Sequence, residues 1–351
     1  MESIERVTKV LRGELPDRVP VGLHCYLLAC RMHGGRFDEI LRSGELQAEA
    51  QLDAWRTFGH DVIMLENGVC AEAEALGCAI RYTADGPPHV AEPLIKELDD
   101  LENLRVPDPE RTFPLNELLK ATRIVKQETR GKVFVNGRSD QGPIALALAL
   151  TGPERFLTML MEPELRDWCL RLVDFCSRVN VALGEAQRLA GADSSTIGLA
   201  GTSLISPALF DAFELPGARA FCAALRRTGG FAFVHACGDE TLLLENLLAT
   251  GADCLELDPQ TDAETCKHVV QGRASVLGMI DPAQVMRFGT LETVRHQASR
   301  ILALMGSGGG FIIGPGCALP PDTPEENVQA LVECARREGV YGADGRLRGK
   351  A

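Results

Sequence analysis

The stretch Phe231-Ala232-Phe233-Val234-His235-Ala236-Cys237-Gly238 indicates both the fold of this chain and its chemistry. It opens with a short, continuous apolar run, which is typical of a strand buried on both faces of a parallel sheet. A second run of this kind, Phe311-Ile312-Ile313, leads into Gly314-Pro315-Gly316-Cys317. One imidazole and two thiolates, from His235, Cys237 and Cys317, suit Zn²⁺. This ion prefers nitrogen and sulfur ligands and keeps a fourth position open in catalytic sites.

Eight apolar runs of this kind occur along the chain, separated by segments with helical patterning. The first expected strand lies at the end of the segment 16–23. The other seven span residues 61–65, 132–136, 194–198, 231–235, 253–257, 275–279 and 310–313. The expected helices include residues 3–13, capped by Ser3, and 240–249, 263–270 and 291–304. Strands that alternate with helices predict an α/β fold, a (β/α)8 TIM barrel. A doubly wound open sheet is the alternative, but we find neither G-x-G-x-x-G after the first strand nor a G-x-x-x-x-G-K-[ST] loop.

The whole chain, residues 1–351, is expected to form one barrel domain. The segment 66–119, which follows the second expected strand, is too long for a simple crossover. It contains Gly86-Pro87-Pro88 and an acidic run from Glu97 to Glu102. We therefore expect an insertion after strand two that forms a lid or a small subdomain.

The composition narrows the class of protein. The 351 residues are 45% hydrophobic and 24% charged, with a formal net charge of -13, which is a soluble globular profile. No Lys/Arg-rich run is present, so nucleic acid is not an expected partner. No apolar run approaches the roughly 20 residues that cross a bilayer, and the charged start Met1-Glu2-Ser3-Ile4-Glu5-Arg6 does not resemble a signal peptide. Twelve singly scattered cysteines indicate reduced, mostly buried thiols and a cytoplasmic protein.

In (β/α)8 barrels the chemistry lies at the carboxyl ends of the strands, so His235, Cys237 and Cys317 would face one mouth. Further polar residues that follow the expected strands are His24, Glu66, Asn67, Asn136, Arg138, Asp140, Asp258, Gln260 and Asp281. Our candidates for substrate binding are Glu66, Asn136, Arg138, Asp258 and Asp281. A polar residue at a strand end is also a common helix cap or turn former, and Asp258-Pro259 and Asp281-Pro282 fit that alternative equally well. His24 has the alternative role of a hydrogen-bonded core histidine.

Two C-terminal segments resemble a known family. Leu277-Gly278-Met279-Ile280-Asp281-Pro282, followed by Phe288-Gly289-Thr290, resembles the L-G-x-I-D-P…G-T element of the uroporphyrinogen decarboxylase superfamily. The segment from Gly314 to Asn327 resembles that superfamily as well, and shorter matches such as Ala75-Leu76-Gly77 extend over almost the whole chain. The resemblance implies a (β/α)8 barrel, in agreement with the strand count.

The superfamily has two main branches, and the residues favour one of them. The true decarboxylases carry an R-Q-A-G-R motif near the N-terminus and an Asp after strand two. Here the region from Tyr26 to Arg36 lacks that pattern, and Gly68 stands at about the Asp position. A porphyrinogen with its many carboxylates needs several arginines, so we exclude haem biosynthesis. The corrinoid-dependent methyltransferases that act on thiols are zinc enzymes with an H-x-C…C ligand set, and the resemblance implies that set for His235, Cys237 and Cys317.

The resemblance therefore implies a zinc-dependent methyltransferase. It would move a methyl group between a corrinoid, free or on a separate corrinoid protein, and a small substrate such as a thiol or a methylated ether, amine or thioether. One departure is Leu199-Ala200-Gly201, where relatives commonly have an acidic residue, and it leaves the substrate open. Two alternatives stay open: a metal-free uroporphyrinogen decarboxylase-like lyase, and a non-catalytic barrel that binds a corrinoid or another ligand. A homodimer is one option for assembly.

Overall fold

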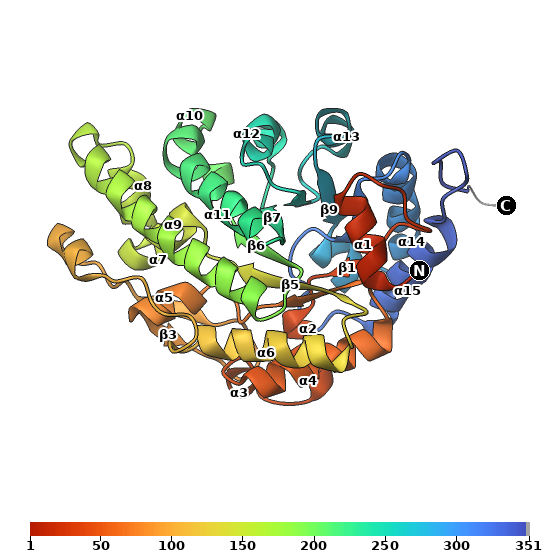
Figure 1. Ribbon diagram of the computed structural model, residues 1–351, viewed down its shortest axis with the longest axis horizontal. Helices are drawn as coiled ribbons and strands as arrows, with labels where there is room; N and C mark the ends of the chain where they lie inside the picture. The colour runs from red at the N-terminus through yellow and green to blue at the C-terminus, as the bar shows by residue number, and fades with distance from the viewer. Residues whose placement is uncertain (349–351) are drawn as a thin grey trace.

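A computed structural model, which describes residues 1–348, shows a barrel of eight parallel strands surrounded by helices (Figure 1). The strands follow one another around the barrel in the order β1 Gly22–Leu23, β2 Val62–Leu65, β5 Phe134–Ser139, β6 Ser194–Gly198, β7 Phe231–Ala236, β8 Cys254–Leu257, β9 Ser275–Ile280 and β10 Phe311–Pro315. All seven adjacent pairs are parallel. The predicted (β/α)8 TIM barrel is confirmed.

The barrel closes where β10 meets the first strand. Val21 bridges Ile313, and the Ile313 N–H donates to the Pro20 carbonyl at 3.0 Å. The backbones approach so closely at this seam that a Cβ on Gly314 would lie 2.0 Å from the Gly22 oxygen. Only glycine fits at such a contact, which explains one residue of the Gly-Pro-Gly-Cys stretch on structural grounds.

The helices follow the predicted pattern with shifts at their ends. They are α1 Ser3–Leu11, α2 Tyr26–His33, α3 Phe37–Ile40, α4 Gly44–Phe58, α5 Ala71–Leu76, α6 Leu115–Glu128, α7 Pro143–Thr151, α8 Pro153–Met159, α9 Arg166–Leu189, α10 Pro207–Leu209, α11 Leu215–Arg227, α12 Leu244–Ala249, α13 Ala263–Val270, α14 Leu291–Ile301 and α15 Glu325–Glu338. A 3-10 turn precedes α12, and a π-helical turn, Leu302–Gly306, follows α14. The predicted cap by Ser3 is wrong, because Ser3 lies inside α1 and its hydroxyl donates to Asp61 instead.

The interior of the barrel has an apolar lower layer. Side chains alternate between the inside and the outside along each strand. At the amino ends of the strands the inward residues are large and apolar, for example Phe134, Phe233 and Ile312, and they pack with Val7 and Val10 of α1. Helix α1 therefore closes the bottom of the barrel, and any ligand must enter from the opposite end.

Strand β5 differs from its prediction in a way that affects the site. The expected strand 132–136 starts two residues later and runs on to Ser139. Asn136 and Arg138 therefore lie within the strand and are not in a loop after it. Both continue the inward series that Phe134 begins, so they form part of a polar upper layer inside the barrel.

The predicted insertion after strand two is present between β2 and α6. It contains α5, the antiparallel strands β3 Ala79–Arg81 and β4 His89–Glu92, and a 3-10 turn, Leu98–Asn103. It ends at α6, earlier than the expected residue 119. Ile95 and Leu101 pack into a cluster formed by α7, α8 and α9, and the Trp168 indole donates to the Leu98 carbonyl at 2.9 Å. The insertion is thus anchored on the outer helices of the barrel.

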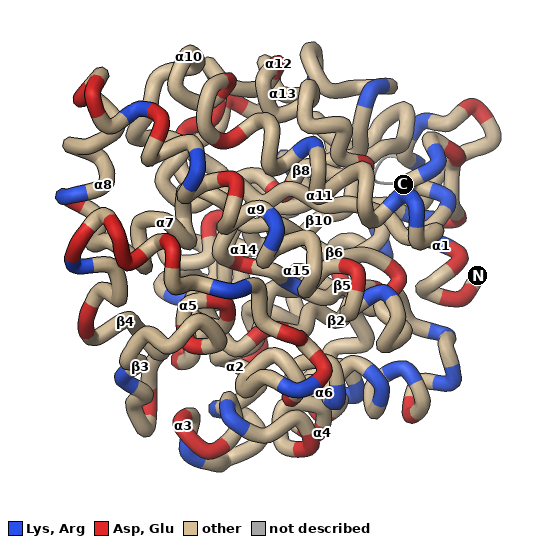
Figure 2. Tube along the Cα trace, turned by 60° about the vertical axis from the view of Figure 1, so that its left-hand side comes forward, with Lys and Arg blue, Asp and Glu red and all other residues tan. Residues whose placement is uncertain are grey.

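Acidic and basic residues are interspersed over the outer helices (Figure 2).

All twelve cysteines are free; ten are buried, and Cys237 and Cys317 are partly exposed. Of the residues that the structure describes, no helix combines the length and the apolar character needed to cross a membrane.

Candidate metal centre and the charged network beneath it

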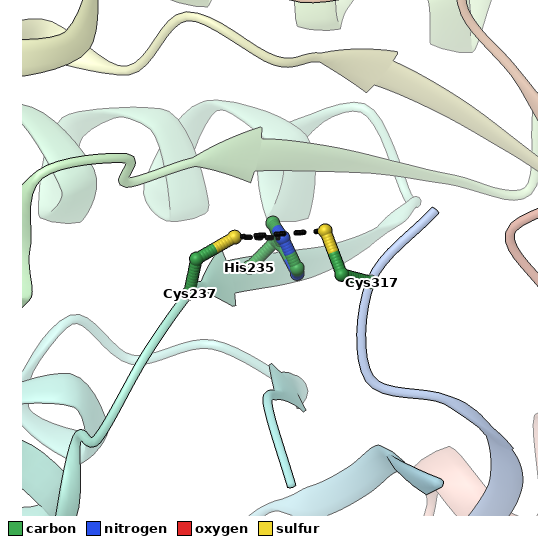
Figure 3. A group of neighbouring side chains, drawn as sticks. All are labelled: His235, Cys237 and Cys317. Carbon is green, nitrogen blue, oxygen red and sulfur yellow. Dashed lines mark hydrogen bonds between the residues drawn. The ribbon is translucent and has the colours of Figure 1, made fainter. Parts of the chain in front are cut away.

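Three potential metal ligands converge at the carboxyl ends of two strands. His235 is the second-to-last residue of strand β7, Cys237 follows that strand directly, and Cys317 follows β10. His235 Nε2 lies 2.9 Å from Cys237 Sγ, which lies 3.8 Å from Cys317 Sγ. The candidate ligand atoms all lie within 4.8 Å of one another. Figure 3 shows the imidazole between the two thiol groups. Residues 80 positions apart in the chain thus form one cluster, as predicted.

The two thiols influence each other strongly. The hydrogen bond between them raises the pKa of Cys237, and burial raises it further. The same bond lowers the pKa of Cys317; burial opposes this, but the bond to His235 and its positive charge support it. The pair therefore holds one thiolate readily and resists a second without additional positive charge. Burial acts to lower the pKa of His235, but the bond to Cys317 and the Cys317 charge raise it overall.

This donor set fits a zinc ion. Two sulfurs and one imidazole nitrogen are the ligand types that Zn²⁺ prefers, and three protein ligands are the usual number in a catalytic zinc site. A divalent cation would supply the positive charge that the second thiolate needs. In the described part of the chain, this is the one cluster of at least three candidate metal-binding side chains.

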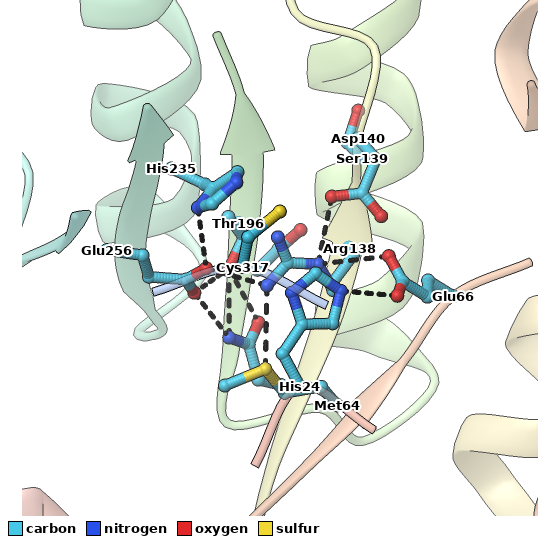
Figure 4. A network of polar contacts seen from close by, with 12 residues as sticks. His24, Met64, Glu66, Arg138, Ser139, Asp140, Thr196, His235, Glu256 and Cys317 are labelled. Carbon is cyan, nitrogen blue, oxygen red and sulfur yellow. Dashed lines mark hydrogen bonds and ion pairs between the residues drawn. The ribbon is translucent and has the colours of Figure 1, made fainter. Parts of the chain in front are cut away.

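A fully buried arginine lies beneath the three ligands (Figure 4). Arg138 Nη1 donates to Glu256 Oε2 at 2.7 Å, and Arg138 Nε donates to Asp140 Oδ1 at 2.8 Å. Glu66 Oε2 lies 3.3 Å from the same Nε. Burial acts to lower the pKa of Arg138, but the carboxylates raise it well above its usual range. Arg138 thus stays charged and holds three carboxyl groups from different strands.

Glu256 receives more hydrogen bonds than the other two carboxyl groups. Its Oε1 accepts from Thr196 Oγ1 at 2.7 Å and from Asn136 Nδ2 at 3.2 Å, while Arg138 occupies Oε2. Burial would raise the pKa of Glu256, but Arg138 and His235 lower it. Glu256 is therefore ionised.

The other two carboxyl groups face each other and carry excess negative charge. Burial raises the pKa of Asp140 well above its usual range and also raises that of Glu66. A shared proton between them relieves the repulsion. His24 Nε2 makes a short contact with Glu66 Oε1, and burial lowers the pKa of His24 to about 3. His24 is therefore neutral, with the hydrogen-bonded core role that we considered for it.

The structure brings three of the five predicted substrate residues together. Glu66, Asn136 and Arg138 all lie in the network beneath the metal ligands. Asp258 is half-buried at the mouth, where its Oδ1 accepts from the Gln260 backbone at 3.0 Å, as a turn former does.

Asp281 has the bonding of a helix cap. Its Oδ1 accepts from the backbone of Ala283 at 2.8 Å and of Gln284 at 2.7 Å, at the start of the π-helical turn Pro282–Arg287. No described contact joins Asp281 to the metal ligands, so its substrate role stays a prediction.

The sequence analysis missed Glu256 and Thr196. Both lie inside strands, so they were counted with the buried runs instead of with the strand ends. The signal that could have revealed Glu256 is the period of two: in Cys254-Leu255-Glu256-Leu257 it shares a face with Cys254, which packs inside the barrel. A carboxylate on an inward face is costly unless it is paired, so it marks a polar interior.

Comparison with known proteins identifies the family. The model of the family described as uroporphyrinogen decarboxylase (URO-D) matches residues 2–338. The chain therefore belongs to this family, and the resemblance found in the sequence is confirmed. Within it, the chain is 28% identical over 350 residues to the methylcobamide:CoM methyltransferase MtbA of Methanosarcina acetivorans, covering 95% of this chain and 97% of that protein. It is 27% identical over 309 residues to the uroporphyrinogen decarboxylase of Syntrophotalea carbinolica, covering 86% and 87%.

A solved structure supports the fold. A methyltransferase from Methanosarcina mazei superposes with a TM-score of 0.85 at 24% identity, over 96% of this chain and 99% of that one. The likeness therefore extends over nearly the whole chain.

Proposed function

We propose that this protein is a zinc-dependent methyltransferase that moves a methyl group between a corrinoid and a small thiol or methylated substrate. The observation that carries the proposal is the convergence of His235, Cys237 and Cys317 at the open end of the barrel, with their ligand atoms within 4.8 Å. The similarity to methylcobamide:CoM methyltransferases over nearly the full length supports it.

The residues divide the work between binding the ion and shaping the site. Zn²⁺ held by His235, Cys237 and Cys317 would supply a Lewis acid that lowers the pKa of a bound thiol or polarises a methylated substrate. The two partly exposed sulfurs face the mouth, so a small substrate can reach the open position. Arg138 and its carboxylates form a rigid floor beneath the ligands, which fixes where a substrate stops and excludes water from below.

We propose that a separate corrinoid protein docks on the mouth. Four large apolar side chains are exposed on segments that follow strand ends: Val69 at 56%, Leu204 at 70%, Leu242 at 87% and Phe288 at 66%. We call these four residues the apolar rim. The loops after β6 and β7 touch each other, because Thr202 Oγ1 donates to Glu240 at 2.9 Å. A carrier that must present a methyl group to the buried ligands would cover this rim.

The insertion, residues 66–119, is our candidate for a lid. It starts directly at the mouth, and the Cys70 thiol donates to the Pro88 carbonyl at 3.4 Å. A cytoplasmic location and a homodimer remain predictions from the sequence.

The experiment measures zinc content and methyl transfer on the same preparations. Protein reconstituted with zinc should bind one ion per chain and consume methylcobalamin in the presence of a suitable small thiol, followed by the corrinoid absorbance. Cys237→Ala and Cys317→Ala should lose both properties, whereas Cys266→Ala, which changes a buried cysteine of α13, should keep both. Zinc-independent release of carbon dioxide from a porphyrinogen would favour the lyase instead. Corrinoid binding without turnover under any condition would favour the non-catalytic barrel.

A further inference from the structure

One nitrogen of the metal cluster is left without a partner. His235 is buried, and its Nε2 faces the two sulfurs. Its other ring nitrogen, Nδ1, is buried and makes no hydrogen bond. A buried polar group without a partner costs about 1–3 kcal/mol, so an acceptor close to Nδ1 would stabilise the site.

That group is the carboxylate of Glu256. Its Oε2 lies 3.6 Å from His235 Nδ1, which is about 0.5 Å longer than an ordinary hydrogen bond. The strand register explains the approach: His235 of β7 pairs directly with Glu256 of β8, so both side chains lie at the same level inside the barrel. A small tilt of the imidazole toward β8 closes the contact.

Glu256 is itself held in place from three sides. Arg138 of β5 occupies Oε2, and Thr196 of β6 and Asn136 of β5 occupy Oε1. Its position is therefore set by strands β5 and β6 as well as by its own strand. A carboxylate fixed in this way can orient another side chain because it does not move with it.

We propose that Glu256 is a positioning residue that holds His235 in the tautomer with the proton on Nδ1, and so leaves Nε2 free to bind the metal ion. Metal-ligating histidines commonly donate their second N–H to such a partner, and loss of the partner typically weakens metal binding 10- to 100-fold. The inference rests on the proposed metal site. It adds a residue from a third strand, β8, that touches neither the ion nor the substrate.

Other charged groups around His235 do not explain its orientation. His24 lies with its ring centroid 6.1 Å away in an edge-on arrangement, too far for a hydrogen bond. Arg138 faces His235 with a positive charge, which cannot accept a proton. Glu256 is thus the one described acceptor that the structure places against Nδ1.

The test uses Glu256→Gln, which keeps the shape and the ability to accept from Arg138 but removes the charge. In metal-free protein labelled with ¹⁵N at histidine, at an alkaline pH where the His235 ring is neutral, long-range proton–nitrogen NMR spectra report the tautomer of each ring, and a His235→Asn variant identifies the His235 signals. We expect the proton on Nδ1 in the wild type and a mixture of tautomers in Glu256→Gln. Competition with a chromophoric chelator should show zinc dissociation constants about 10- to 100-fold higher in the variant.

The matched control is Asp140→Asn. Asp140 also bonds to Arg138, but it does not face His235, and its raised pKa means that a neutral amide reproduces its charge. This control should keep the wild-type tautomer and zinc affinity. If Glu256→Gln does not fold because Arg138 is left undercompensated, the double variant Arg138→Met, Glu256→Gln removes the buried positive charge as well, and thermal unfolding verifies its fold.

Two results would overturn the inference: an unchanged His235 tautomer with unchanged zinc affinity in folded Glu256→Gln, or equal losses in Asp140→Asn. These outcomes are separable from failure of the proposed function. If the wild type binds zinc but transfers no methyl group, the proposed activity is wrong while the role of Glu256 toward the ion is still measured.

Discussion

Replacing Leu242 by alanine should weaken use of a protein-bound methyl donor without affecting a free one. Leu242 follows β7 and is 87% exposed, so almost its whole side chain is available to a partner. Full burial of a leucine side chain is worth about 1.5–3 kcal/mol, and 1.4 kcal/mol is a factor of ten in affinity. If a corrinoid protein covers the apolar rim, Leu242→Ala should raise its KM about 10- to 100-fold with little change in kcat.

The assay compares two methyl donors on the same variant. A methylated corrinoid protein that supports wild-type turnover should show the higher KM, while free methylcobalamin should show wild-type kinetics because it needs no protein surface. The control is Leu189→Ala. This residue ends α9 just before β6, at the opposite end of the barrel, and it is 81% exposed. Equal behaviour of Leu242→Ala and Leu189→Ala toward the protein-bound donor would refute docking at the rim.

Three further outcomes are expected. Cys317→Ala should lose zinc and methyl transfer but keep its melting temperature within a few degrees, because the apolar lower layer does not involve the ion; collapse of the circular dichroism signal would contradict this. Asp61→Asn should cost about 3–5 kcal/mol near neutral pH. Burial raises the pKa of Asp61 but Arg18 and Arg6 lower it overall, so its stabilisation is present above about pH 4 and fades below it, and the gap between the two melting curves should narrow in acid. Burial raises the pKa of Glu214 to about 8, so its folded form is protonated and wild-type stability should fall as pH rises from about 4.5 to 8; Glu214→Gln should flatten that fall, and an unchanged pH profile of the melting temperature would argue against it.

The sequence was sufficient for the barrel because strands buried on both faces have a strong signal. Mostly continuous apolar runs identified all eight. The boundaries were less certain, since β5 runs on through Asn136-Gly137-Arg138-Ser139. No local pattern predicts that a strand continues into polar residues, because those residues become tolerable only when Glu256 and Glu66, which are distant in the sequence, pair with Arg138.

The residues of the candidate site also differ in how far the sequence alone predicts them. The clustering of His235, Cys237 and Cys317 could be predicted because their positions at strand ends follow from the fold; their role as metal ligands stays a prediction. The period of two could have placed Glu256 inside the barrel but not beside His235, because that position depends on the register between β7 and β8. The roles considered for Asp258 and Asp281 show the converse: each carries backbone hydrogen bonds of a turn or cap, and the sequence alone could not choose between that role and substrate binding.

The charged residues in the upper layer of the barrel interior are better explained by a role in a reaction than by a role in stabilising the fold. Buried ion pairs are weak sources of stability, and apolar residues of similar size often serve a fold as well or better. The lower layer of this barrel is in fact apolar, with Phe134, Phe233 and Ile312 filling the same type of position. A chain that can pack its interior with such residues has no folding reason to place Arg138 and three carboxyl groups one level higher. That level is the one directly beneath His235, Cys237 and Cys317, so the charged network occurs where a reaction would need fixed groups.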